Sequence, residues 1–294
     1  MAVPRFTFVG VPIDSVGREG GTEFAPARIR EVSAGTELWD GDGGDLRVSI
    51  RGDDRDPATG IIASDDVLRT TAAVEEAVAG LVGDRRTPFV MGGCCTLMPG
   101  SLAGARRVLG PTALVYIDGH LDLYDGTTSP TGEAADMPMS VVLGRGPSAW
   151  VDACGGQVVD PSHAAIVGFR DLEDALRYGH PDPADIPGIT AIDADGVRAR
   201  GGAAVGADLV ERFREPGRLW VHLDVDVLDQ DVFPATDYLM PGGLGWRELT
   251  DLLGPLLTSP SLAGVSVGCY NPTKDPHGAD GRAFVEALRT AALG

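Results

Sequence analysis

Three polar side chains with the spacing of a metal-binding segment follow an apolar run near the middle of the chain. Asp118, His120 and Asp122 alternate with small or apolar residues, directly after residues 113–117. The run is typical of a buried strand, and in extended chain every second side chain points to the same side. Two carboxylates and an imidazole at a buried strand end are costly to desolvate unless a partner such as a divalent cation neutralises them. The alternative is a strand end whose polar residues are simply hydrated, and this segment alone does not decide between the two.

A second segment with two more carboxylates favours the metal site. Asp224 and Asp226 follow another apolar run with the same two-residue spacing. Together with Asp118 and Asp122 they would place four carboxylates in one pocket, where they repel one another unless cations lie between them. One ion does not readily use all four and His120, whereas two ions bridged by Asp118 and Asp224 do. Two such ions can hold a bridging hydroxide at neutral pH.

The elements that must position these residues alternate between strands and helices. Several strands are predicted as continuous apolar runs, and helices lie between them, such as the one from Asp65, its expected N-cap, to about Val82. This order is typical of a parallel sheet covered on both faces, which predicts an α/β fold. Ligands of such sheets bind at the carboxyl ends of the strands. Cys94, Cys95 and Cys269 also follow predicted strands, so they are expected beside the aspartates.

Composition and charge exclude several classes of partner. The chain has 294 residues, 43% of them hydrophobic, and shows no internal repeat or long linker, so one domain spanning residues 1–294 is expected. The formal net charge of −19 argues against nucleic acid and anionic membrane surfaces. No run is long enough to span a membrane, and the first residues lack the pattern of a signal peptide, which predicts a cytoplasmic protein. The remaining histidines lack partners in sequence and are expected to be structural or solvated: His163, His180, His222 and His277.

The order of several short motifs resembles the ureohydrolase superfamily, which contains arginases, agmatinases and formiminoglutamases. The two aspartate segments are similar to the metal signatures of that family. The other segments that carry the resemblance are residues 10–14, 26–30, 92–96, 167–171, 241–244 and 271–272. The resemblance implies a three-layer α/β/α sandwich with a mostly parallel sheet, a homo-oligomer of three or six chains, and a small-molecule substrate. It also implies hydrolysis of guanidino or amidino C–N bonds by a hydroxide that bridges two Mn²⁺ ions.

The resemblance implies a role for each candidate site residue as well. One metal would be bound by Cys95, Asp118, Asp122 and Asp224. The other would be bound by Asp118, His120, Asp224 and Asp226. Catalytic roles would fall to Asp122, which orients the hydroxide, and to His120. The substrate would contact Thr131, Glu133, Glu173 and Cys269.

Three positions depart from the family pattern. Cys95 occupies the place of a metal-binding histidine, and a thiolate is a softer ligand, so Zn²⁺ or Fe²⁺ competes with Mn²⁺. Cys269 occupies the place of an acid that contacts the guanidinium, which removes a charged anchor for a cationic substrate. Ala135 falls where arginases have a histidine that shuttles protons. Cys95 and the loop around Thr131 are similar to the hydroxyarginine hydrolase of D-cycloserine biosynthesis, which predicts a related, less basic substrate.

Two function classes follow from these residues. The aspartates favour a metal-dependent hydrolase, because four converging carboxylates have no evident use in an inactive site. The lost anchor and the lost shuttle favour a non-catalytic or metal-poor protein of the same fold that binds or regulates. Metal analysis separates the two, since a hydrolase of this kind binds at least about one divalent cation per chain. Two other interpretations of Cys95 are open: it is an inert thiol, or it forms a disulfide with Cys269. Cys269 as a catalytic nucleophile would need a base nearby, and none is evident in the sequence.

Overall fold

Strands and helices alternate along most of the chain, as the sequence predicts. The computed structural model describes residues 6–17 and 20–293. The strands are β1 (Phe6–Val11), β2 (Trp39–Asp45), β3 (Pro88–Gly92), β4 (Ala113–Ile117), β5 (Ala164–Val167), β6 (Thr190–Ile192), β7 (Leu219–Asp224) and β8 (Leu262–Gly268). The α-helices are α1 (Ala25–Val32), α2 (Ser64–Gly83), α3 (Met98–Leu109), α4 (Pro138–Val142), α5 (Ser148–Ala153), α6 (Leu172–Arg177), α7 (Ala194–Arg200), α8 (Gly202–Arg212), α9 (Trp246–Leu257) and α10 (Ala279–Leu293).

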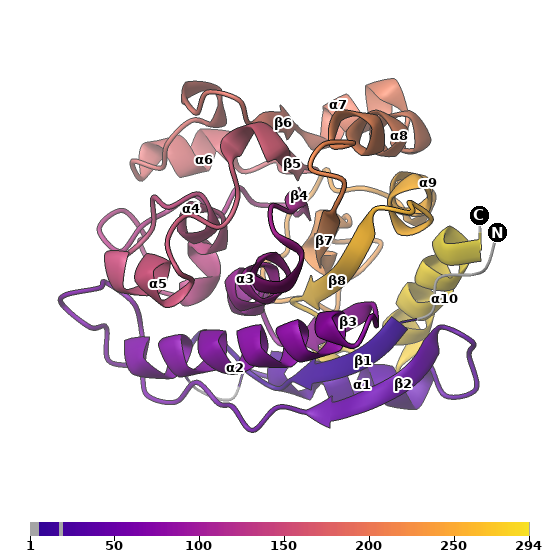
Figure 1. Ribbon diagram of the computed structural model, residues 1–294, viewed down its shortest axis with the longest axis horizontal. Helices are drawn as coiled ribbons and strands as arrows, with labels where there is room; N and C mark the ends of the chain where they lie inside the picture. The colour runs from indigo at the N-terminus through magenta and orange to yellow at the C-terminus, as the bar shows by residue number, and fades with distance from the viewer. Residues whose placement is uncertain (1–5, 18–19, 294) are drawn as a thin grey trace.

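The strands form one sheet at the centre of the molecule (Figure 1). Their order is β2-β1-β3-β8-β7-β4-β5-β6, and every neighbouring pair is parallel. The predicted α/β sandwich is confirmed, with a sheet that is parallel throughout. The inner strands β3, β4 and β7 are buried along their whole length. β3 and β4 are uninterrupted apolar runs because helices cover both of their faces, whereas β7 also carries His222 and ends in Asp224.

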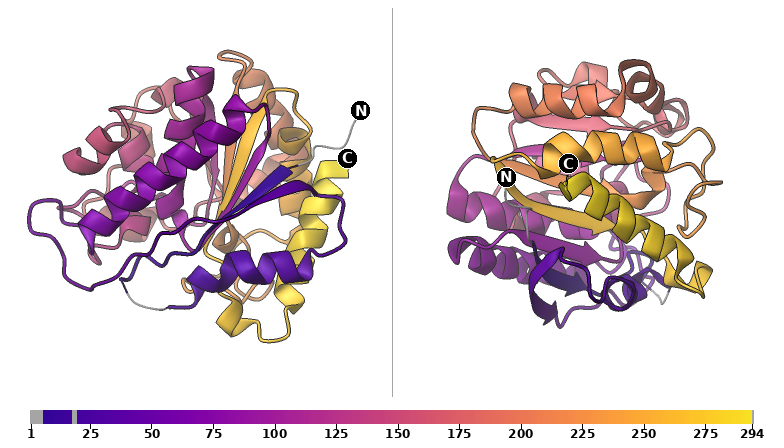
Figure 2. Two further views of the ribbon diagram at one scale, coloured as in Figure 1. Left: turned by 60° about the horizontal axis from the view of Figure 1, so that its bottom comes forward. Right: turned by 90° about the vertical axis from the view of Figure 1, so that its right-hand side faces the viewer.

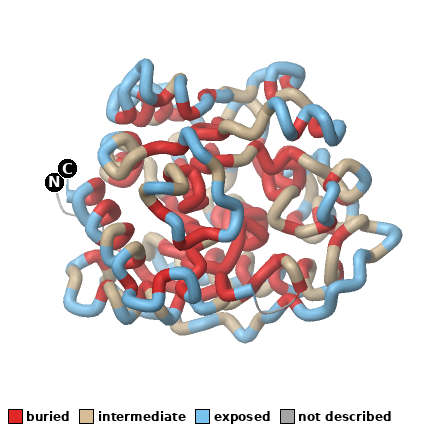
Figure 3. The backbone as a smooth tube through the Cα atoms, turned by 180° about the vertical axis from the view of Figure 1, so that it is seen from behind, coloured by how far each residue is buried: buried red, intermediate tan, exposed pale blue. Residues whose placement is uncertain are grey.

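Helices cover the two faces of the sheet in separate layers. α2 packs along α3 on one face, and α8, α9, α10 and α1 follow one another over the other face (Figure 2). Each face has its own apolar core: Leu102 and Trp150 belong to the first, Leu252 and Phe284 to the second. Buried residues therefore occupy the middle of the molecule and exposed ones its outer rim (Figure 3). None of the described helices has the length and apolar character that crossing a membrane requires.

The sheet order brings together strands that are far apart in the sequence. β3, β8, β7 and β4 are consecutive in the sheet, and Leu223 of β7 pairs with Val267 of β8 on one side and with Ile117 of β4 on the other. Because the four strands are parallel and in matched register, their carboxyl ends lie at one edge. The residues that end or closely follow these strands are Cys94, Cys95, Asp118, Asp224 and Cys269.

The start of α2 differs from the prediction. The sequence predicts Asp65 as the N-cap, but the helix begins at Ser64, after Ala63 in the left-handed conformation with φ 50°. The N-cap residue, Ala63, has no side-chain oxygen to cap the first amide groups of this helix. Asp65 lies instead in the first turn, where a carboxylate interacts favourably with the helix dipole.

Candidate metal centre

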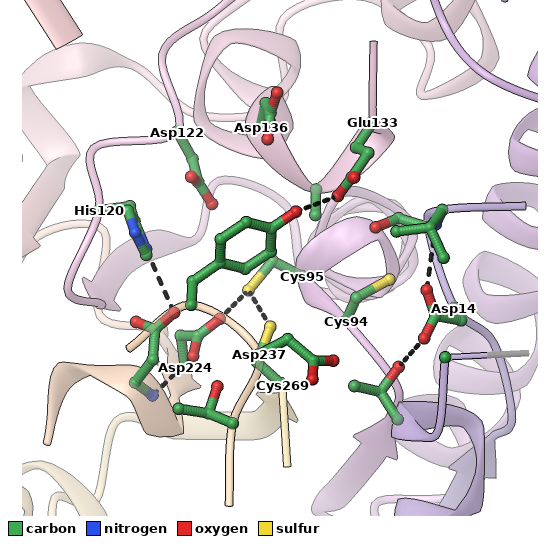
Figure 4. A pocket seen from close by; sticks show the side chains of 18 of the residues that line it. Asp14, Cys94, Cys95, His120, Asp122, Glu133, Asp136, Asp224, Asp237 and Cys269 are labelled. Atoms are coloured by element: carbon green, nitrogen blue, oxygen red, sulfur yellow. Dashed lines mark hydrogen bonds and ion pairs between the residues drawn. The ribbon is translucent and has the colours of Figure 1, made fainter. Parts of the chain in front are cut away.

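The carboxyl ends of the four central strands form the floor of a cavity of about 450 Å³. Cys95, Asp224 and Cys269 lie on this floor, with His120 beside them (Figure 4). Asp226 also lines the cavity. Parallel sheets bind ligands at this edge, because the loops that leave neighbouring strands diverge there and leave a crevice. The residues that the sequence predicts at these strand ends are thus brought to one place.

One group of candidate ligands consists of Asp118, His120 and Asp226, whose donor atoms lie within 4.8 Å of one another. His120 Nδ1 is 3.2 Å from Asp226 Oδ2 and 3.5 Å from Asp118 Oδ1. Backbone amides hold both carboxylates: the N–H of His120 donates to Asp118 Oδ1 at 2.7 Å, and that of Gly119 donates to Asp226 Oδ1 at 3.2 Å. Burial alone would lower the pKa of His120, but Asp226 and Asp118 outweigh it and raise that pKa well above its usual value.

A second group lies on the neighbouring strand ends and contains two thiols. Cys95 Sγ is 2.8 Å from Asp224 Oδ2 and 3.8 Å from Cys269 Sγ, and the donor atoms of all three residues lie within 4.8 Å of one another. Burial, the hydrogen bond with Cys269 and the charge of Asp224 raise the pKa of the Cys95 thiol well above its usual value, so the thiol donates to Asp224. Asp118 Oδ2 is 3.7 Å from Cys95 Sγ, which brings Asp118 close to both groups.

The electrostatics of the floor fit divalent cations. Burial and the charge of Asp226 raise the pKa of Asp118 to about 6, and burial with Asp226 and Asp118 raises the pKa of Asp224 well above its usual value. Burial and Asp118 also raise the pKa of Asp122. Carboxylates in this situation need protons or cations between them. The carboxylate, imidazole and thiolate donors present here are ligands for Mn²⁺, Zn²⁺ and Fe²⁺.

Asp122 is held apart from both donor groups. Within the described chain, no group of three close donor atoms includes it, and its Oδ2 accepts a hydrogen bond from the Tyr116 hydroxyl. The next residue, Leu123, donates its N–H to His180 Nε2 at 2.8 Å, and His180 Nδ1 then donates to the carbonyl of Pro181. Burial lowers the pKa of His180 to about 4, so the neutral ring keeps this bond at neutral pH. Asp122 therefore borders the cavity on a fixed loop, and its role as a metal ligand stays a prediction.

Two aromatic rings support the floor and were not expected there. His222 is buried with its Nε2 3.2 Å from Cys95 Sγ, and Tyr116 stacks on it with 4.9 Å between ring centroids. The rings meet because Tyr116 pairs with His222 in the register of β4 and β7. A signal for both exists in the sequence: Tyr116 lies two residues before Asp118, and His222 two before Asp224, so each shares a strand face with a candidate ligand.

Of the four predicted substrate contacts, Glu133 and Cys269 line the cavity, and Thr131 and Glu173 do not. Glu133 lines the cavity, and its Oε2 accepts a hydrogen bond from the Tyr238 hydroxyl at 2.7 Å. Thr131 does not line the cavity, but its hydroxyl donates a hydrogen bond at 2.5 Å to Asp136, and Asp136 does line it. Glu173 lies on α6 with its side chain 86% exposed and forms an ion pair within that helix. The structure therefore makes Thr131 a support for the wall and turns Glu173 toward solvent.

The wall is acidic. Six carboxylates line the cavity besides those of Asp224 and Asp226: Asp14, Asp122, Glu133, Asp136, Asp171 and Asp237. Among the described lining residues there is no lysine or arginine. Asp171 Oδ1 and Thr236 Oγ1 are buried without a hydrogen-bond partner in the part of the chain that the structure describes. The sequence predicts neither side chain as a site residue, because neither follows the alternation of the strand ends, although Asp171 ends the segment 167–171.

Fold and site together define a class of protein: an α/β/α sandwich with a carboxylate-rich site for divalent cations at the carboxyl ends of its central strands. Solved structures share the fold. The arginase of Bacillus caldovelox superposes with a TM-score of 0.86 at 22% identity, covering 99% of this chain and 98% of that one. The formimidoylglutamase of Bacillus subtilis superposes with a TM-score of 0.75 at 19% identity, covering 100% of this chain and 87% of that one.

Sequence comparison identifies the family. A model of the Arginase family matches residues 4–294. The arginase of Staphylococcus aureus (strain MRSA252) is 27% identical over 276 residues, which are 91% of this chain and 90% of that protein. The chain therefore belongs to the arginase family, whose members hydrolyse C–N bonds, and the resemblance to the ureohydrolases is confirmed. The finer similarity to the hydroxyarginine hydrolase of D-cycloserine biosynthesis stays a prediction.

Proposed function

We propose that this protein hydrolyses a C–N bond in a guanidino or amidino compound that is less basic than arginine, such as a hydroxyguanidine. One observation carries the proposal: the donor group Asp118, His120 and Asp226 is complete, while position 269 presents a thiol 3.8 Å from Cys95 Sγ where a carboxylate would anchor a guanidinium. A fully charged guanidinium would lose a charge-assisted hydrogen bond at that position. A hydroxyguanidine carries less positive charge at neutral pH and depends less on such an anchor.

Two divalent cations would be held by the two donor groups. Asp118, His120 and Asp226 would bind one, and Cys95 with Asp224 would bind the other. Asp118 approaches both groups and would be shared between them, as would Asp224 by family resemblance. When bound, such ions supply Lewis-acid activation of water and polarise the substrate.

The remaining chemistry falls to side chains of the cavity. Because Tyr116 occupies Asp122 Oδ2, Oδ1 is the atom left to take up a proton from the attacking water and pass it to the departing nitrogen. This short route through one carboxylate needs no second proton carrier, and Ala135 provides none on the wall. His120 borders the same space, with its ring edge-on to Tyr238. The acidic wall, where Asp171 Oδ1 has no hydrogen-bond partner among the described residues, suits an ammonium group elsewhere on the substrate.

A product-release assay tests the proposed substrate class. The full chain, loaded in turn with Mn²⁺, Zn²⁺ and Fe²⁺, is offered arginine, hydroxyarginine, agmatine and guanidino acids, and urea and hydroxyurea are measured. We expect kcat/KM for the hydroxyguanidine to exceed that for arginine at least about tenfold, since a missing charge-assisted hydrogen bond costs about 1.5–3 kcal/mol. The variant Cys269→Glu, which restores an acid, is expected to shift the preference back toward arginine.

Two outcomes would contradict the proposal. Equal kcat/KM for arginine and hydroxyarginine in the parent chain would contradict the argument that the thiol of Cys269 disfavours a fully charged guanidinium. Absence of product from every substrate at full metal occupancy would instead favour the non-catalytic binding protein of the same fold.

A further inference from the structure

Two cysteines from distant parts of the chain meet on the cavity floor. β3 and β8 are neighbours in the sheet, and the N–H of Cys269 donates to the carbonyl of Gly93 at 2.8 Å. A side chain at Gly93 would collide with the backbone oxygen of Ile13, so only glycine lets the end of β3 pass this close to the loop after β1. The result is a separation of 3.8 Å between the sulfurs of Cys95 and Cys269, which point toward one another in Figure 4.

The backbone of Cys269 adopts a conformation that side chains rarely tolerate. Its φ is 68°, in the left-handed region that favours glycine. Such an outlier in a non-glycine residue costs free energy and concentrates at functional sites. Here it accompanies a sulfur directed at Cys95 Sγ and Asp224, rather than a side chain that simply fills a core.

A chain of buried hydrogen bonds ends on the sulfur of Cys95. Trp220 Nε1 donates to Ser266 Oγ at 2.9 Å, Ser266 Oγ is 2.8 Å from His222 Nδ1, and His222 Nε2 is 3.2 Å from Cys95 Sγ. The indole N–H only donates, so the serine hydroxyl accepts that bond and can give its own proton to His222 Nδ1. His222 then carries its proton on Nε2, directed at the sulfur. An N–H donor of this kind stabilises and orients a thiolate that binds a metal.

We propose that Cys95 and Cys269 both bind the same divalent cation as thiolates, with Asp224 as the third protein ligand. The proposal rests on the proposed function in one respect, that the site binds divalent cations. It changes the role of Cys269 from a substrate contact to a metal ligand. When the cation binds, each thiol releases one proton to solvent, so two protons are displaced per cation.

The two halves of the site would differ in their preference for metals. Two thiolates and a carboxylate form a soft donor set that selects Zn²⁺ or Fe²⁺ over Mn²⁺. Asp118, His120 and Asp226 provide a harder set of two carboxylates and an imidazole. A site with one position of each kind would hold two different metals, or it would fill its thiolate position with Zn²⁺ before it fills the other position.

Cobalt absorption counts the thiolate ligands directly and does not depend on activity. The full chain, reduced and freed of metal, is titrated with Co²⁺, and the near-ultraviolet sulfur-to-cobalt charge-transfer band is measured. We expect Cys269→Ser and Cys95→Ser each to lose about half of the band, and the double variant to lose all of it. Cys154→Ala is the matched control, because that cysteine is buried at the end of α5, away from the cavity, and the band should stay unchanged.

Competition between metals provides a second measurement. With Zn²⁺ and Mn²⁺ offered together, Cys269→Ser is expected to lower the occupancy ratio of Zn²⁺ to Mn²⁺ at least about tenfold, the effect of losing one soft ligand. Cys269→Gly, which suits the positive φ, should show the same loss. A loss in both variants therefore reports the missing sulfur and not a disturbed backbone.

Two results would overturn the inference. A full charge-transfer band and an unchanged metal ratio in both Cys269 variants would show that only Cys95 binds the cation. The second result would come from exposing the parent chain to a small disulfide such as oxidised glutathione. A disulfide pair instead of a metal site would be shown by three observations: the chain becomes lighter by two hydrogens, it does not bind Co²⁺ until it is reduced, and it has no thiolate band even when reduced. If the parent bound no divalent cation at all, the proposed function would fail as well; binding and hydrolysis without any contribution from Cys269 would refute this inference alone.

Discussion

Replacing Asp118 by asparagine is expected to lower turnover at least about a thousandfold and to remove most of the bound metal. Asp118 approaches both donor groups, with Oδ1 3.5 Å from His120 Nδ1 and Oδ2 3.7 Å from Cys95 Sγ. An amide keeps the volume of the side chain but loses the charge that holds a cation between buried carboxylates. Lewis-acid stabilisation by metals is worth several kcal/mol, and about 1.4 kcal/mol corresponds to a tenfold change in rate.

Metal analysis and turnover of Asp118→Asn are measured together. Asp231→Asn is the matched control, because Asp231 is exposed on the loop after β7 and does not line the cavity. The control should keep both its metal and its turnover. Turnover within about tenfold of the parent in Asp118→Asn would show that the carboxylate is not needed to hold the cations.

Removing metal is expected to make the stability of the protein fall as the pH rises. Burial and Asp226 raise the pKa of Asp118 from 3.8 to about 6, so the folded state binds this proton more tightly than the unfolded state. A carboxyl group of this kind contributes its stability in full below its unfolded pKa and loses it as the pH rises through the folded pKa. The difference between 3.8 and about 6 corresponds to about 3 kcal/mol for Asp118 alone.

His180 acts in the opposite direction over the same pH range and must be separated from this effect. Its pKa is lowered to about 4, so its contribution is present above its unfolded value and is lost as the pH falls. The measurement is therefore a difference: denaturant unfolding of the metal-free parent and of metal-free Asp118→Asn between about pH 4 and about pH 7. We expect the advantage of the parent to shrink by about 2–3 kcal/mol as the pH rises, because only the parent carries the Asp118 carboxyl.

Restoring the cation is expected to reverse the loss near neutral pH. At a free concentration of about 1,000 times the Kd, one bound cation adds about 4 kcal/mol to the free energy of unfolding. Asp118→Asn serves as the control and should gain little. A metal-free parent whose stability relative to Asp118→Asn does not change with pH would contradict the raised pKa, and a parent that gains nothing from Mn²⁺, Zn²⁺ or Fe²⁺ would contradict the cation site.

The candidate ligands are visible in the sequence because their signal is local. Asp118, His120 and Asp122, and likewise Asp224 and Asp226, alternate directly after buried apolar runs, and alternation places such side chains on one side of extended chain. The α/β class is visible for the same reason, since apolar runs and helical periods follow one another along the chain. Neither inference needs to know which strands are neighbours.

The order of the strands is decided only by the tertiary structure, because it depends on how helices from distant parts of the chain pack over the sheet. That order brings Cys269, which follows β8, close to Cys95, which lies just beyond β3. It also sets the register that stacks Tyr116 on His222. The orientation of α6 is likewise not local, and it leaves the side chain of Glu173 exposed.

Asp118, His120 and Asp226 therefore follow from residue spacing and are brought together by the fold. The second sulfur beside Cys95, and the hydrogen bonds that support it, exist only because four separate strand ends meet at one edge of a parallel sheet.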